Sequence, residues 1–201
     1  MTEAVFQKKF RYHHGNLRDA LLQAAMAILQ EQGIEALSLR TLAKATGVTQ
    51  AAPYSHFRDK NDLLAAMAEK GFQSLAIGMA EAATGATTVR QRIERLMTSY
   101  IEFACANKTL FRLMFGREVA DMKAYPTLAM TAGKSYALIS AALSKHAKSP
   151  DDARFLTVAL WSLCHGMTTL LVDERLDIAQ FGTPSVEAFV SQTVGKIHIF
   201  Q

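Results

Sequence analysis

Apolar residues recur along most of the chain at spacings of three and four, which is the period of an α-helix. The alternation of apolar and polar residues that marks strands is nearly absent. The first helical face consists of five apolar residues, Leu17, Leu21, Ala24, Ala25 and Ile28. We expect this helix to begin near Asn16, a good N-cap, and to stop at Gly33. The fold class is therefore predicted to be all-α.

Eight further helices follow from the same periodicity and from start and stop signals, so about nine are expected. The expected ranges are Leu39–Ala45, Gln50–His56, Asp59 or Asn61 to Ala83, Val89–Ala104, Asn107–Phe115, Pro126–Lys148, Asp151–Asp173 and Pro184–Ile199. Ser38 is the expected cap of the second helix and Thr49 of the third. No internal repeat interrupts this order.

Composition narrows the class of protein. The chain has 201 residues, 50% of them hydrophobic, which is enough for a buried core and excludes a disordered or collagen-like chain. Its two cysteines, Cys105 and Cys164, lie far apart and allow neither a disulfide framework nor a structural zinc site. The segment Met1–Tyr12 is polar and basic and does not resemble a signal peptide, so we expect a cytoplasmic protein.

One segment invites a membrane interpretation. Phe155 to Val172 contains no Asp, Glu, Lys or Arg, but its length is at the short limit for a bilayer core of ~30 Å. It also holds several polar residues, among them Ser162 and His165. A helix that is apolar all round is otherwise buried all round, so we expect it to lie between its own core and a second subunit.

The segment Ser38–Phe57 predicts a helix-turn-helix. Small Ala43 allows two short helices to cross closely, and Gly47 can adopt the positive φ that the turn requires. Taken alone, this pattern also fits an αα-corner that has no role in nucleic-acid binding.

The residues that follow resemble the signature of TetR-type transcriptional regulators. Val48 to Leu64 reads VTQAAPYSHFRDKNDLL, with the Tyr-x-His-Phe run that ends the recognition helix of that family. Upstream, Tyr12 to Arg18 reads YHHGNLR and resembles the opening of the family's first helix. The resemblance implies a DNA-binding domain over residues 1–62 and a helical effector-binding and dimerisation domain over residues 63–201. Pro53 departs from the family pattern and predicts a short helix with a 3₁₀-like start.

Charge and side-chain chemistry agree with DNA as a partner. Residues 1–60 hold eight basic and five acidic residues, a net +3 of the chain's +4. Thr49, Gln50 and Ala51 are the candidates for base contacts, because short polar side chains at a helix start can reach base edges. By similarity to the family, five residues are assigned to phosphates: Arg40, Thr41, Tyr54, His56 and Lys60.

The basic N-terminal residues leave alternatives open. His13 and His14 could be metal ligands, but adjacent histidines do not share a helix face, so DNA-backbone contact or solvation is favoured. The basic residues Lys8, Lys9 and Arg11 form either an arm that orders on DNA or an ordinary solvated tail. No metal and no cofactor is expected.

The C-terminal half has a second resemblance. The run ALWSLCHGMTTLL, Ala159 to Leu171, resembles the Trp-x-x-x-His-Gly core of the WHG-type C-terminal domain of one TetR branch, from about residue 88. His165 could line an effector pocket or be a hydrogen-bonded core histidine. Large adaptable side chains that could line such a pocket, or simply pack the core, are Met97, Tyr100, Phe103, Phe111, Met114, Phe115, Tyr136, Trp161 and His165.

The resulting expectation is a homodimeric repressor that binds double-stranded DNA at a palindromic operator and is released by a small-molecule effector. Residues 151–173 and 184–199 would form the dimer interface. One alternative is an all-α carrier or enzyme without a DNA role, although the sequence shows no catalytic arrangement and Cys164 and His165 point apart on a helix. The other alternative is an activator, or a regulator that senses a protein partner.

Overall fold

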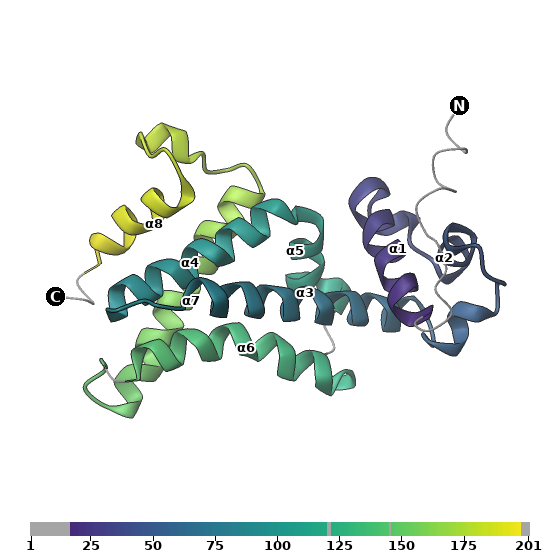
Figure 1. Cartoon of the computed structure of the whole chain (residues 1–201), viewed down its shortest axis with the longest axis horizontal. Coiled ribbons are helices and arrows are strands. Elements are labelled where there is room, and N and C mark those ends of the chain that lie inside the picture. Colours follow the sequence, from purple (N-terminus) through teal and green to yellow (C-terminus); the bar gives the residue numbers. More distant parts are fainter. Residues whose placement is uncertain (1–16, 120–121, 145, 198–201) are drawn as a thin grey trace. The chain divides into compact units, whose positions relative to one another are not determined.

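The computed structural model describes residues 17–119, 122–144 and 146–197, and these residues form helices and connecting turns without strands. The all-α prediction is confirmed (Figure 1). The α-helices are α1 (Leu17–Gln32), α2 (Leu39–Thr46), α3 (Lys60–Ala82), α4 (Val89–Ala106), α5 (Lys108–Phe115), α6 (Pro126–Leu143), α7 (Pro150–Val172) and α8 (Val186–Gly195). Short 3₁₀ helices are η2 (Ile34–Ala36), η3 (Ala52–Ser55), η4 (Arg117–Val119), η5 (Met122–Ala124) and η6 (Ile178–Phe181).

The helices group into two compact units. The N-terminal unit runs through Gly71 and also contains Thr109–Leu128, whereas the C-terminal unit contains Phe72–Lys108 and the chain from Ala129 onward. The expected domain boundary between residues 62 and 63 lies inside α3, which is continuous across it. Helices α3 and α6 each contribute residues to both units.

The core of the N-terminal unit forms where α1 packs on α2 and η2. The predicted apolar face of α1 is buried from Leu21 to Ile28, while Leu17 at its start is half-buried. On α2, Leu42 and Ala43 are 0% and 1% exposed. The small side chain at Ala43 thus sits in the core, as the helix-turn-helix pattern predicts.

Side-chain caps fix most helix starts where the sequence predicts them. Ser38 Oγ accepts the Thr41 N–H at 3.0 Å, and Asp59 Oδ1 accepts the Asp62 N–H at 2.9 Å, so Asp59 opens α3. Ser149 and Ser185 cap α7 and α8 in the same way. Each hydroxyl or carboxylate satisfies a backbone donor that the helix leaves without a partner.

The prediction that Thr49 caps an α-helix over Gln50–His56 is wrong. Here the chain forms η3, which is preceded by Ala51 and has no side-chain cap. The Ala52 N–H donates to the Thr49 carbonyl at 3.0 Å, and Pro53 has no N–H to extend an α-helical ladder. The third of the nine expected helices is therefore a short 3₁₀ element, in line with the predicted effect of Pro53.

In the C-terminal unit α4 packs against both α7 and α8. Tyr100 and Met97 of α4, Leu160 and Cys164 of α7, and Val190 of α8 are buried. By length and composition α7 is the one helix of the described ranges that could cross a membrane, and only 33% of its apolar window is buried within the chain. Much of the α7 surface is therefore exposed on the single chain.

Replacement of Gly47 by alanine tests the turn between α2 and η3. Gly47 has φ 69° and ψ 25°, a left-handed conformation that disfavours a Cβ, although nothing lies within 4 Å of that position. We expect Gly47→Ala to lower the free energy of unfolding by about 1 kcal/mol through backbone strain alone. The measurement is urea denaturation followed by circular dichroism.

Gly133 provides the matched control for this substitution. It is exposed within α6, has open space around it and no positive φ, so Gly133→Ala should stabilise by up to about 1 kcal/mol. Equal effects at the two glycines would contradict the assignment of strain to Gly47.

Candidate functional site

A left-handed turn separates α2 from η3. The Gly47 N–H donates to the carbonyls of Ala43 and Lys44, and the Val48 N–H donates to the Ala43 carbonyl at 3.1 Å. These bonds close the carboxyl end of α2 and redirect the chain within two residues. The result is the helix–turn–helix outline that the sequence predicts, with η3 as its second element.

The predicted base-contact residues all lie on the surface. Thr49, Gln50 and Ala51 are exposed, and Tyr54 is 58% exposed. Pro53, between them, is buried. The segment thus presents its polar side chains outward while one residue anchors it to the core.

Phe57 supplies the second anchor, at the end of η3. Its ring is 2% exposed, and its N–H donates to the Pro53 carbonyl at 2.9 Å. The guanidinium carbon of Arg18 lies 5.5 Å from the centre of this ring, in a cation–π arrangement with α1. Phe57 therefore connects the surface segment to α1.

The residues assigned to phosphates differ in how they are held. Arg40 is exposed near the start of α2, and His56 is half-buried at the end of η3. The Thr41 hydroxyl accepts the Ser38 N–H at 2.9 Å and lies 2.9 Å from the Ala36 carbonyl, so it belongs to a capping box. Lys60 Nζ donates to the Ile34 carbonyl at 2.9 Å, which ties the start of α3 to η2.

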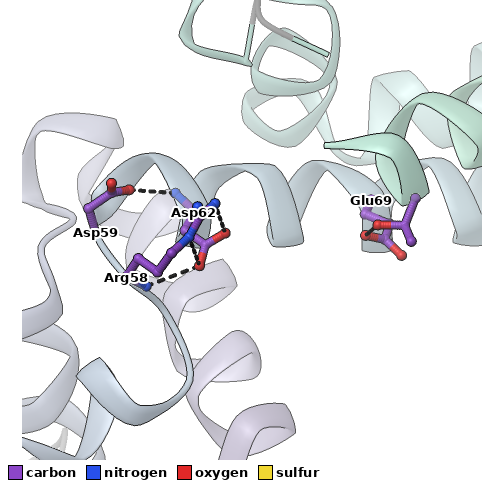
Figure 2. A network of polar contacts seen from close by, with 5 residues as sticks. Arg58, Asp59, Asp62 and Glu69 are labelled. Carbon is purple, nitrogen blue, oxygen red and sulfur yellow. Dashed lines mark hydrogen bonds and ion pairs between the residues drawn. The ribbon is translucent and has the colours of Figure 1, made fainter. Parts of the chain in front are cut away.

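A compact polar network closes the start of α3 (Figure 2). Asp62 Oδ2 accepts the backbone N–H of Arg58 at 3.0 Å, and Asp62 Oδ1 lies 3.3 Å from Arg58 Nη2. Burial alone would raise the pKa of Asp62. The hydrogen bonds from Arg58 and the positive charges of Arg58 and Arg18 outweigh it and hold that pKa below its ordinary value.

Sequence reasoning missed most of these polar contacts. The spacing from Asp59 to Asp62 is that of a capping box and could have indicated the α3 network. No local signal points to the Lys60 bond with Ile34, nor to the hydrogen bond of the Thr127 hydroxyl with Glu69 Oε2 at 3.1 Å, because the partners lie far apart in sequence.

In the C-terminal unit, four aromatic or imidazole side chains from α4, α6 and α7 form a row. Tyr100 Oη lies 2.9 Å from His165 Nδ1. The His165 ring stacks on Trp161 with centroids 5.4 Å apart and planes 7° apart, and Tyr136 meets Trp161 edge-on at 6.3 Å. Burial lowers the pKa of His165 and raises that of Tyr100, so both rings are held in their neutral forms.

The nine predicted pocket residues divide between the two units. Met97, Phe103 and the four residues of the aromatic row belong to the C-terminal unit. Phe111, Met114 and Phe115 belong to the N-terminal unit, where Phe111 and Phe115 contact each other at 4.9 Å and Met114 packs against Gly71. The predicted set therefore does not form one cluster: the aromatic row lies in one unit, and Phe111, Met114 and Phe115 lie in the other.

Some predicted residues lie outside the described part of the chain. They are Lys8, Lys9, Arg11, His13, His14 and the expected cap Asn16. Within the described ranges, no cluster of three or more His, Cys, Asp or Glu side chains could hold a metal ion.

Asp62→Asn tests the polar network at the start of α3. Because the folded pKa of Asp62 lies below its ordinary value of 3.8, the charge stabilises the fold above that pH, and the stabilisation is lost as the pH falls through the folded pKa. We expect a loss of about 0.5 kcal/mol at pH 7 that disappears at acidic pH. Urea denaturation at several pH values measures it, with Glu31→Gln on exposed α1 surface as the control. A loss that is independent of pH would exclude the charge as its cause.

Comparison with protein families gives two matches. A model described as bacterial regulatory proteins, tetR family, matches residues 21–67, which contain most of α1, all of α2 and η3, and the start of α3. A model described as tetracyclin repressor-like, C-terminal domain, matches residues 93–195, which is more than half of the chain and contains Trp161, His165 and Gly166.

Curated relatives align over part of their length. The chain is 44% identical over 52 residues to the tetracycline repressor protein class C of Escherichia coli, covering 26% of this chain and 24% of that protein. It is 28% identical over 98 residues to the HTH-type transcriptional activator FasR of Mycolicibacterium smegmatis, covering 49% and 45%. The chain thus spans about a quarter to a half of the length of these relatives.

A solved structure matches over nearly the whole chain. It is a protein of unknown function from Rhodococcus sp. RHA1, 33% identical, with a TM-score of 0.78 and coverage of 92% of this chain and 94% of that one. Together with the two family matches and the exposed helix-turn-helix segment, this shows that the chain belongs to the TetR family of bacterial regulatory proteins.

Proposed function

We propose that the chain is a cytoplasmic homodimeric repressor that binds a palindromic operator and leaves it when a small molecule binds. The observation that carries this proposal is the exposed segment from Thr49 to Tyr54, which is anchored by Pro53 and Phe57. In the proposed division, residues 1–62 bind DNA and residues 63–201 bind the effector and form the dimer.

At the DNA, base contacts come from the exposed side chains before η3. Gln50 can pair bidentately with an adenine, and Ala51 can touch a thymine methyl group. Arg40, Tyr54 and His56 contact phosphates, as does Lys60, whose bond to Ile34 uses one of its three N–H donors. Thr41 acts mainly by holding α2 in place, because its hydroxyl is engaged in the capping box.

Two substitutions separate base contacts from phosphate contacts. We expect Gln50→Ala to cost about 1–3 kcal/mol at the operator and to relax specificity at one base pair, without changing the salt dependence. Arg40→Ala should weaken operator and random DNA alike and reduce the salt slope by about 1. Fluorescence anisotropy with labelled duplexes at several salt concentrations measures both.

The control for this pair is Gln192→Ala, which removes an exposed glutamine from α8. It should leave operator affinity and salt slope unchanged. Wild-type protein that binds the DNA next to its own gene no better than random duplex would refute the regulatory proposal.

The dimer is proposed to form through the outward face of α7, with residues 184–199 beside it. This face carries Phe155, Val158 and Leu170, which are 78%, 49% and 46% exposed. Between them lie exposed small residues, Ser162 and Gly166, over which a second helix can approach closely. The buried face of α8 already packs on α4, and outward residues such as Glu187 are polar, so α7 supplies most of the apolar contact. In the proposed dimer the two η3 segments occupy the half-sites of a palindromic operator, which lie one DNA turn, ~34–36 Å, apart.

Gly166→Arg tests this interface without disturbing the subunit. No atom lies within 4 Å of the position a Cβ would take, so the arginine fits the single chain but would be buried unpaired between two α7 helices. We expect a monomer by analytical ultracentrifugation and at least about tenfold weaker operator binding, since two linked half-site contacts become one. The matched control Gly133→Arg, also exposed with open space, should remain dimeric. A Gly166→Arg protein that stays dimeric would exclude α7 as the interface.

Activation is the second candidate for the direction of regulation. One relative is named a transcriptional activator, so activation on the same DNA site is the alternative. A reporter gene behind the operator separates the two. Deletion of the regulator raises expression if it represses and lowers expression if it activates.

A further inference from the structure

An exposed arginine directly follows the Phe57 anchor and is held in one orientation. Arg58 Nε and Nη2 lie 3.4 Å and 3.3 Å from the two carboxylate oxygens of Asp62, and the Arg58 backbone N–H donates to the same carboxylate at 3.0 Å (Figure 2). The Arg58 side chain is nevertheless 74% exposed. A guanidinium carries five N–H donors, so three of those of Arg58 remain available to a group outside the protein.

A second exposed arginine lies over the ring of the same anchor. The guanidinium carbon of Arg18, in the first turn of α1, is 5.5 Å from the centre of the buried Phe57 ring. This cation–π contact restricts the side chain and leaves the N–H groups at the edge of the guanidinium open. Within the described part of the chain these N–H groups make no hydrogen bond and no ion pair.

Both guanidinium groups lie close to one carboxylate. The positive charges of Arg58 and Arg18 each lower the pKa of Asp62, which places that carboxylate within reach of both. The neighbouring Asp59 carboxylate accepts the Asp62 N–H and so caps α3. Asp62 carries one negative charge and can neutralise only one of its two arginines. An anion from outside the protein can therefore neutralise the other.

These two arginines adjoin the exposed segment that is proposed to read the DNA. Arg58 comes three residues after η3, and Arg18 reaches the Phe57 ring from α1. Phosphates flank the groove that such a segment enters, and contacts to them fix the protein on the duplex. Planar guanidinium groups match phosphate oxygens in geometry, and side chains that the fold already holds lose little entropy on contact.

We propose that Arg18 and Arg58 form a binding site for the phosphodiester backbone of duplex DNA beside η3. This inference rests on the proposed DNA binding and adds two residues to its phosphate contacts. Phe57 and Asp62 act as positioning residues, because the ring orients one guanidinium and the carboxylate orients the other. Such a site binds any sequence and contributes to the salt-dependent part of the affinity.

Arg18→Gln and Arg58→Gln test the site in the whole chain. Fluorescence anisotropy with the duplex next to its own gene and with random duplex is measured over a range of sodium chloride concentrations. We expect each substitution to weaken both complexes about three- to tenfold at ~0.1 M salt, and to lower the slope of log affinity against log salt by about 0.5–1 per subunit. Weaker binding with an unchanged slope would show a purely structural role and overturn the proposal, as would unchanged binding.

Two further variants serve as controls. Arg92→Gln removes an exposed arginine from α4 in the C-terminal unit and should change neither affinity nor slope. Arg18→Lys keeps the charge but lacks the planar group that lies over Phe57. Its slope should stay near that of wild type, with an affinity between those of wild type and Arg18→Gln. If Arg18→Lys lost as much slope as Arg18→Gln, a charge contact at Arg18 would be excluded.

A comparison of two salts separates the DNA backbone from free phosphate as the ligand. Sodium phosphate and sodium chloride at equal ionic strength should weaken DNA binding of wild type equally, because both act by screening. A stronger effect of phosphate that Arg18→Gln abolishes would assign the site to the free ion and overturn the proposal.

The two duplexes keep this proposal apart from the regulatory one. If wild type binds both duplexes equally and the slopes fall in Arg18→Gln and Arg58→Gln, the regulatory proposal fails and the phosphate site stands. If wild type prefers the duplex next to its own gene and the slopes do not fall, the phosphate site fails and the regulatory proposal stands. Absence of binding to either duplex would overturn both.

Discussion

The arrangement of the proposed DNA-binding surface depends on the burial of Phe57. This ring fills the core next to α1, where Arg18 lies over it, and the Phe57 N–H holds the Pro53 carbonyl. A 3₁₀ element as short as η3 has few internal hydrogen bonds, so it cannot hold its own orientation. The two buried anchors at Pro53 and Phe57 supply that orientation. They thereby determine the direction in which the exposed residues before and between them point.

Polar residues near Phe57 either stabilise the fold by capping helices or present donors at the surface, and a few do both. The Thr41 hydroxyl and the Asp62 carboxylate satisfy backbone donors at the starts of α2 and α3. Lys60 holds η2 through one N–H and retains two donors for an external anion. In the proposed phosphate contact, the Lys60 side chain would already be fixed in position, so little side-chain entropy would be lost.

Local chemistry explains which features could be predicted from sequence. The helix starts at Ser38, Ser149 and Ser185 were predictable because a cap involves only residues three positions apart. The prediction that Thr49 caps an α-helix was wrong, because Pro53 has no N–H to extend an α-helical ladder. Contacts between distant residues, such as Lys60 with Ile34, could not be predicted, because periodicity places a residue on a helix face without naming its partner. For the same reason the predicted pocket set mixed residues of both units.

Helix α7 connects the two proposed properties of the C-terminal unit. Its inward side carries Trp161 and His165 of the aromatic row, and its outward side carries Phe155 and Leu170 of the proposed dimer face. An α-helix moves nearly as a rigid rod, so a ligand that shifts the inner face by a fraction of an ångström also shifts the outer one. In a dimer built on that face, such a shift alters the spacing of the two η3 segments. The ligand must still bind the altered spacing more tightly than the DNA-competent one, since equal affinity for both would move no equilibrium.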